Sequence, residues 1–175
     1  MSEAPDPTRD NPPAPLAPLR ILAQYIRDLS FEVPGGPEIF TLLRTAAPEI
    51  PTSIDMSMRH MSGTMYEVIL SAHVEAFVSG KTAFILEIEY GCVAELDETI
   101  IPPDHIHPAL LMEVPRLIFP FVRQIVADMT VSGGFPPLML QMMDFGDIYR
   151  KKFGLGGQLV EKTGDTAPPE GSTIN

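Results

Sequence analysis

The chain has 175 residues, of which 45% are hydrophobic, and a formal net charge of −11 at pH 7. This length and apolar content suit one domain with a single core. Because phosphate backbones and anionic lipids would repel so negative a protein, the charge argues against nucleic-acid or membrane-surface binding and favours a cationic protein partner.

The composition of both ends of the sequence predicts that they are disordered. Residues 1–18 are rich in proline and residues 154–175 in glycine, threonine and proline. Neither segment has enough large apolar side chains to offset the entropy cost of ordering it, so we place the single domain at 19–153. The start of the chain lacks a cationic-then-apolar signal pattern and no apolar run reaches the length of a membrane span, which predicts a cytoplasmic protein without membrane insertion.

The segment from Arg20 to Val33 alternates between apolar and polar residues, as a half-buried strand does. Its odd-numbered residues, Tyr25 among them, are expected to face the core, and its even-numbered residues to face solvent. Arg27 breaks this alternation, as Phe77 does in a later segment, and a β-bulge or an edge position would account for both.

Three further strands are predicted, at residues 54–59, 64–78 and 82–96. The turn residues Ser62-Gly63 and Ser79-Gly80 separate them and predict two tight hairpins. The domain therefore begins with a four-stranded antiparallel sheet, and with the helices predicted after it the fold class is α+β.

One face of this sheet is expected to be acidic, with Arg59 as the main positive exception. The acidic residues with outward parity are Asp28, Glu32, Asp55, Glu67, Glu75, Glu87 and Glu89. Two interpretations stay open: an ordinary solvated sheet face, or a docking surface for a cationic partner.

A long helix is predicted from a cap at Asp104 to Gly133-Gly134, and Pro115 and Pro120 should start, kink or segment it. An apolar stripe at helical spacing should cover the sheet; its residues are Val122, Ile125, Val126 and Met129. The segment LLMEVPRLIFPF adds apolar residues around the helix, which indicates burial on two sides and hence an oligomer interface.

The segment VSGGFPPLMLQMMDF, residues 131–145, combines large apolar side chains with glycines and prolines that break regular structure. It is expected to link the long helix to a short helix at 145–153, with Asp144 and Asp147 as a capping arrangement.

No catalytic centre is visible in the sequence, which has no phosphate-binding glycine loop and no nucleophile elbow. We therefore expect a protein that is not an enzyme and needs no cofactor, and we interpret the single Cys92 as a packing residue. The alternative is a small oligomeric ligand-binding protein or a metal-dependent enzyme that uses His105 and His107. Their spacing would bring the two imidazoles together only on a strand, whereas the prolines around them predict a loop or helix start, so no metal is expected.

Two motifs, in this order, resemble the bacterial protein-export chaperone family SecB. They are D-x-S-F-E-x-P at Asp28 to Pro34 and L-x-F-P-F/Y-x-R at Leu117 to Arg123. The resemblance runs from about Ile21 to Phe153, most of the predicted domain.

The resemblance implies a four-stranded antiparallel sheet with two helices packed at one face, assembled as a homotetramer that is a dimer of dimers. It implies an ATP-independent holdase in the bacterial cytoplasm that binds unfolded precursor polypeptides and delivers them to the translocase motor SecA. The motor-binding residues correspond by motif to Asp28, Glu32 and Glu87. Client-binding residues of the family correspond to Phe135, Leu138, Leu140 and Met142, for each of which core or tetramer interface is the competing interpretation.

Overall fold

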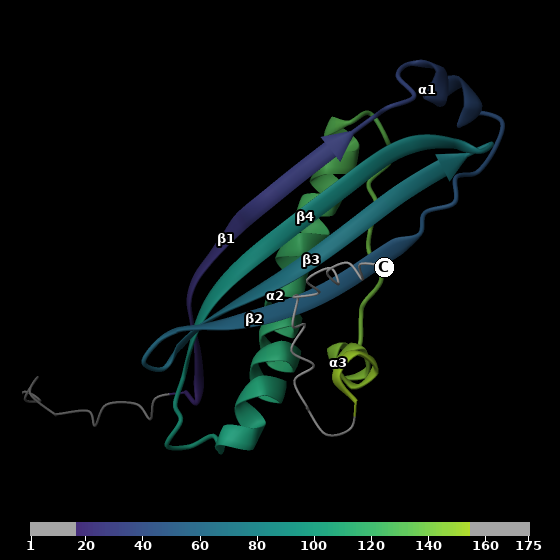
Figure 1. The fold of residues 1–175 in the computed structure, drawn as a ribbon. Coiled ribbons are helices and arrows are strands. Elements are labelled where there is room, and N and C mark those ends of the chain that lie inside the picture. The colour runs from purple at the N-terminus through teal and green to yellow at the C-terminus, as the bar shows by residue number, and fades with distance from the viewer. Residues whose placement is uncertain (1–16, 155–175) are drawn as a thin grey trace, which may run out of the picture.

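The computed structural model describes residues 17–154 and has an α+β fold. In chain order the elements are β1 (Leu19–Glu32), α1 (Glu38–Leu42), β2 (Thr52–Ser62), β3 (Met65–Val78), β4 (Lys81–Leu96), α2 (Pro103–Ser132) and α3 (Phe145–Phe153). The strands form one antiparallel sheet in the order β1-β4-β3-β2, which confirms the predicted four-stranded sheet (Figure 1). The disorder expected at 1–18 and 154–175 falls almost wholly outside the described residues.

The two predicted hairpins place β3 and β4 at the centre of the sheet. Gly63 and Gly80 have φ values of +55° and +76°, which a glycine adopts without steric cost in a tight turn. The even-numbered residues of β3 and β4 point to the face that α2 covers, and they are almost all buried.

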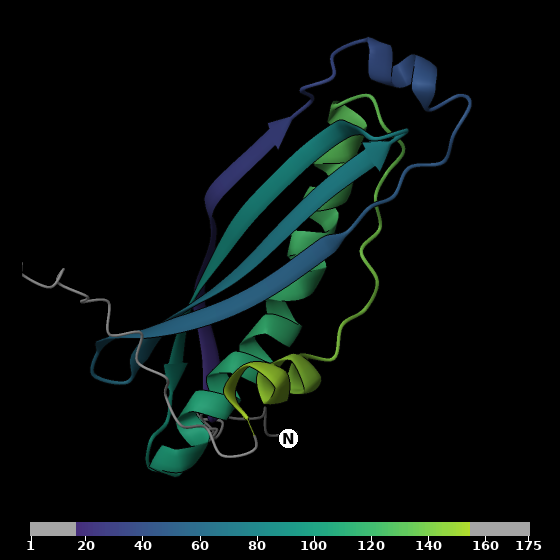
Figure 2. The same cartoon turned by 45° about the vertical axis from the view of Figure 1, so that its right-hand side comes forward.

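Helix α2 packs on one face of the sheet, where it contacts β2, β3 and β4, and Figure 2 shows it running along the length of the sheet at a slant to the strands. Pro115 and Pro120 neither start nor segment the helix, which is continuous through its three internal prolines; the kink that was the third expectation stays a prediction. The predicted cap at Asp104 is wrong: Pro102 is the N-cap, Pro103 begins the helix, and Asp104 lies in the first turn, where its charge suits the helix dipole. None of the helices among residues 17–154 is long and apolar enough to cross a membrane.

The alternation predicted for β1 is wrong in its middle. The register of β1 against β4 shifts between Ile21 and Ala23 and again between Ile26 and Asp28, so two bulges reverse the parity of the residues between them. Directly paired residues of antiparallel strands point to the same face. Tyr25 pairs with Gly91 and therefore lies on the face away from α2, hereafter the outer face, and not in the core.

Bulges also explain the two residues that broke the alternation. Arg27 lies at the second shift in β1, and Phe77 lies at a register shift between β3 and β4. The expectation of a bulge at these positions is confirmed.

Helix α3 has the predicted bounds, and its cap is confirmed because the side chain of Asp144 accepts a hydrogen bond from the Asp147 amide at 3.1 Å. It packs against α2, and its residues Phe145 and Tyr149 join the core that α2 forms with the sheet. The short helix α1 was not predicted from the sequence; it lies in the connector between β1 and β2.

Candidate functional site

Two adjoining hollows form an apolar groove along the edge of the sheet beside β2. The first has a volume of about 260 Å³ and is lined by Leu43, Pro48, Ile50, Ala76, Ala83, Phe84, Phe135, Pro136, Pro137 and Leu138. The second has a volume of about 320 Å³ and is lined by Ile50, Thr52, Leu138, Met139, Leu140, Gln141 and Met143. Because Ile50 and Leu138 line both, we treat the two as one groove.

The wall of the groove is the segment between α2 and α3, which leaves α2 near α1 and runs beside β2 to α3 (Figures 1 and 2). Its start is fixed by Thr130, a buried polar residue of α2. The Thr130 hydroxyl bonds to the Ala127 carbonyl at 2.9 Å and accepts a hydrogen bond from the Leu138 amide at 3.0 Å. The Phe135 amide donates to the Thr130 carbonyl at 3.0 Å. These bonds hold an irregular segment in one place without regular secondary structure.

Phe135 closes the inner end of the groove and is only 7% exposed. Its ring contacts those of Phe40 and Phe84, with centroids 5.1 and 4.9 Å away, and lies edge-on to Phe31. Phe135 is thus a core residue whose outward side lines the first hollow.

The structure brings three of the four predicted client-binding residues together in the groove. Leu138 is half-buried, and Leu140 is buried and lines the second hollow. Met142 is 73% exposed and does not line either hollow. Met139 and Met143 line the groove instead, and their place in the same apolar run was the available signal.

A second candidate surface lies on the outer face and is a shallow acidic hollow of about 240 Å³. Its lining residues are Asp28, Ser53, Asp55, Ser71, Ala72, His73, Glu87, Ile88 and Glu89. Asp28 and Glu87, two of the three predicted motor-binding residues, therefore lie together. Glu32 is exposed further along β1, opposite Ile85, and outside this hollow.

Two nitrogen-bearing side chains contact the carboxylates of the acidic hollow. Arg27 lies 3.5 Å from Glu89, and His73 Nδ1 lies 3.0 Å from the carboxylate of Glu87. Since these pairs are exposed, each contributes little to stability and is easily exchanged for another partner.

Glu67 departs from the expected solvated outer face because it is only 5% exposed. Its carboxylate accepts hydrogen bonds from Arg59 Nε and from the hydroxyl of Tyr25. The bond from Arg59, followed by that from Tyr25, lowers the pKa of Glu67, and the same contact raises the pKa of Tyr25. Sequence reasoning missed this cluster because it had placed Tyr25 on the opposite face.

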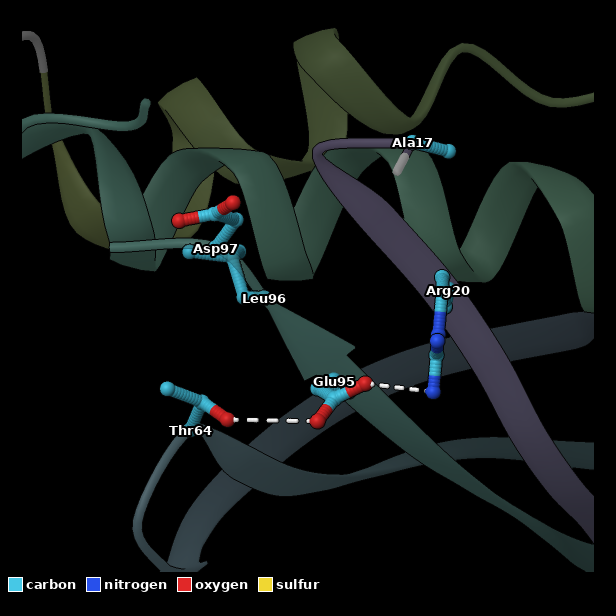
Figure 3. Close-up of a pocket in the computed structure, with 6 residues that line it drawn as sticks. All are labelled: Ala17, Arg20, Thr64, Glu95, Leu96 and Asp97. Carbon is cyan, nitrogen blue, oxygen red and sulfur yellow. Dashed lines mark hydrogen bonds and ion pairs between the residues drawn. The ribbon is translucent and has the colours of Figure 1, made fainter. Parts of the chain in front are cut away.

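A polar cavity of about 190 Å³ lies at the other end of the sheet, where β1 begins and β4 ends. Figure 3 shows Arg20 and Thr64 both pointing to the carboxylate of Glu95, at 2.7 and 3.4 Å. The charges of Arg20 and Glu95 neutralise each other, which indicates a structural tie between β1, β4 and the β2–β3 turn.

His105 and His107 do not share a site. His107 Nδ1 lies 2.8 Å from the hydroxyl of Tyr149, and its ring packs edge-on against Phe153, so burial lowers its pKa. His105 is exposed beside Asp104. Within 17–154, no three His, Cys, Asp or Glu side chains are grouped as a metal site requires. Cys92 is buried, and burial raises its pKa to about 11, which fits a packing role.

Comparison with known proteins gives the family. Residues 13–154 match the model of the preprotein translocase subunit SecB. The chain is 45% identical over 152 residues to the protein-export protein SecB of Paramagnetospirillum magneticum, covering 87% of this chain and 93% of that one. It is 48% identical over 141 residues to that of Rhodospirillum rubrum, covering 81% and 86%.

A solved structure shares the fold. It is the SecB-like chaperone Rv1957 of Mycobacterium tuberculosis in complex with a ChAD peptide from the Rv1956 HigA1 antitoxin, with a TM-score of 0.60 at 14% identity, covering 71% of this chain and 90% of that one. The family match and the sequence identity place the chain in the SecB family of protein-export chaperones.

Proposed function

We propose that this protein is an ATP-independent holdase that binds unfolded precursor polypeptides in the apolar groove. The observation that carries the proposal is a groove walled by an irregular, methionine-rich segment. Methionine offers polarizable contact area that adapts to many partners, and an irregular backbone lets a groove adjust to side chains of different size. Each hollow lies near the small end of ligand pockets, about 300 to 1,000 Å³, which suits single client side chains.

The acidic hollow is the proposed docking site for the translocase motor SecA, to which the chaperone delivers its client in the bacterial cytoplasm. Asp28 and Glu87 lie in it, and Glu32 extends the acidic surface along β1. Opposite charge on the two partners would steer their encounter and fix their relative orientation.

We further propose a homotetramer that is a dimer of dimers. Leu117, Phe121 and Val131 of α2 are about half exposed, as are Leu22 and Ile26 of β1. Apolar side chains gathered on a helix and on a sheet edge are typical of surfaces that another copy covers.

Two variants test the groove. Leu138→Ser with Met139→Ser removes one half-buried and one exposed apolar residue of the lining, so the free energy of client binding should weaken by about 1 to 3 kcal/mol from the lost apolar contact area. The matched control is Met142→Ser, because Met142 lies outside the lining. Suppression of aggregation of a denatured precursor, without nucleotide, measures the effect. Equal client affinity in the double variant and the control, at unchanged stability and oligomer mass, would refute the groove as the client site.

Docking is tested separately by Asp28→Lys with Glu87→Lys. Both carboxylates are exposed, so the folded protein should be retained while SecA affinity falls strongly at moderate salt. Unchanged SecA affinity would contradict the assignment of the acidic hollow.

A further inference from the structure

A single lysine joins α3 to the sheet. Lys152, in the last turn of α3, donates hydrogen bonds to the carboxylate of Asp55 and, at 2.9 Å, to the backbone carbonyl of Met56. Within residues 17–154, every hydrogen bond and ion pair between α3 and the sheet comes from this side chain. Since β2 is an outer strand, Lys152 reaches the sheet at its edge.

The acid that Lys152 holds belongs to the acidic hollow. Asp55 lines that hollow, and across the sheet it is in register with Ser71, which is in turn in register with Glu89. Directly paired residues share a face, so Asp55 and Glu89 both point to the outer face. An ammonium group of the protein itself therefore occupies one end of the surface proposed for cationic docking.

Helix α3 is also connected to the apolar groove. The segment that precedes α3 supplies Gln141 and Met143 to the groove lining, and Phe145, the first residue of α3, packs on Phe119 of α2 with ring centroids 5.6 Å apart. Because these wall residues directly precede α3, a movement of α3 would change the shape of the groove wall. The Lys152 contact links α3 to the hollow on the far face of the sheet.

We propose that a lysine of the cationic partner displaces Lys152 from Asp55 when the partner docks in the acidic hollow, and that this detaches the end of α3 and loosens the groove wall. The inference rests on the proposed function, because it concerns the same hollow and groove. It adds a direct physical link between docking on one face and client holding at the edge.

The contact is weak enough to be exchanged. The Lys152 and Asp55 side chains are 36% and 61% exposed, and an exposed ion pair shifts an equilibrium by only about two- to fivefold. Coupling between two binding sites is reciprocal, so a client that draws the wall inward strengthens the Lys152 contact and weakens docking by the same factor.

The adjacent lysine of the same helix supplies a matched control. Lys151 lies 2.7 Å from Asp147 within α3 and has no bond to the sheet. The variants Lys152→Gln and Lys151→Gln therefore have the same net charge and differ in whether Asp55 keeps its intramolecular partner.

The test uses the full chain in its native assembly, with an oligolysine peptide as the probe. Amide hydrogen exchange of Phe145–Phe153 should speed up about two- to fivefold when oligolysine is added to the parent or to Lys151→Gln. In Lys152→Gln these amides should exchange faster from the outset and respond no further. Oligolysine should also bind Lys152→Gln about two- to fivefold more tightly than Lys151→Gln.

Equal affinities of the two variants for oligolysine, or an equal exchange response, would overturn the inference. Titration with SecA distinguishes failure of this inference from failure of the proposed SecA docking site. If oligolysine gives the expected results but SecA binds neither the parent nor either variant, the SecA assignment fails and the displacement of Lys152 stands. If SecA binds both variants equally and does not change amide hydrogen exchange in α3, the docking site stands and the displacement of Lys152 is refuted.

Discussion

The ring of Tyr25 lies directly over Gly91 on the outer face of the sheet. The two residues are paired in register, and a Cβ added to Gly91 would lie 2.5 Å from Tyr25 Cζ. The hydroxyl of the same tyrosine donates a hydrogen bond to the buried carboxylate of Glu67. The missing side chain at Gly91 therefore makes room for the ring that covers an otherwise exposed acid.

Gly91→Ala should destabilise the protein by about 1 to 3 kcal/mol, because the new methyl group forces the ring away from the sheet. Denaturant unfolding at fixed protein concentration measures this. Combined with Tyr25→Ala, the same change should cost much less, since the clash is gone. Strictly additive effects of the two substitutions would contradict the contact.

Glu67 gives a prediction for pH. Hydrogen bonds from Arg59 and Tyr25 lower its pKa below 4.5, so its contribution to stability is fully present above that value and is lost as pH falls through the lowered pKa. The difference in unfolding free energy between the parent and Glu67→Gln should therefore be largest near neutral pH and shrink below about pH 4. A difference that stays constant across this range would show that the charge of Glu67 is not what the cluster stabilises.

His107 gives a second pH dependence, with its effect on α3. Burial against Tyr149 and Phe153 lowers its pKa below 6.5, so the folded state favours the neutral ring, and its stabilising contribution is lost as pH falls below that value. Amide exchange in α3, corrected for the intrinsic pH dependence, should show more frequent opening at about pH 5 than at about pH 7. His107→Phe keeps an aromatic ring but cannot be protonated, so its opening should not change between these pH values.

The sequence predicted the central strands and α3 correctly because their signals are local. Gly63 and Gly80 mark turns that need positive φ, and Asp144 marks a cap. The middle of β1 was wrong for an equally physical reason: it lies between two bulges. Arg27 exposed one of them through its charge, but Leu22 is apolar like its neighbours and gave no sign of the other.

The groove was only half predictable. The apolar run around Leu138 was visible, but the opposite wall includes Leu43, Pro48 and Ile50, which come from a connector without periodicity. Only the folded chain brings that connector against the segment after α2. The role of Thr130 was missed because nothing in the sequence shows that its hydroxyl accepts a hydrogen bond from the Leu138 amide.

Thr130 offers a test of how firmly the groove wall must be held. In Thr130→Val the shape of the side chain is nearly unchanged, but the partly buried Leu138 amide loses its acceptor, which costs up to about 3 kcal/mol. Because that amide is at the start of the wall, we expect the cost to be relieved by local loosening of residues 135–140. The amide exchange of Phe135 and of residues 138–140 should increase more than that of β3 and β4; the two prolines between them have no amide hydrogen.

Thr130→Ser is the matched control, because it keeps the hydroxyl and removes only a methyl group. If holding the wall in place shapes the groove, Thr130→Val should bind a denatured precursor with altered affinity while Thr130→Ser behaves like the parent. If both variants lose stability equally and bind clients normally, then the hydroxyl serves only the end of α2, and the groove wall is held by the packing of Phe135 against Phe40 and Phe84.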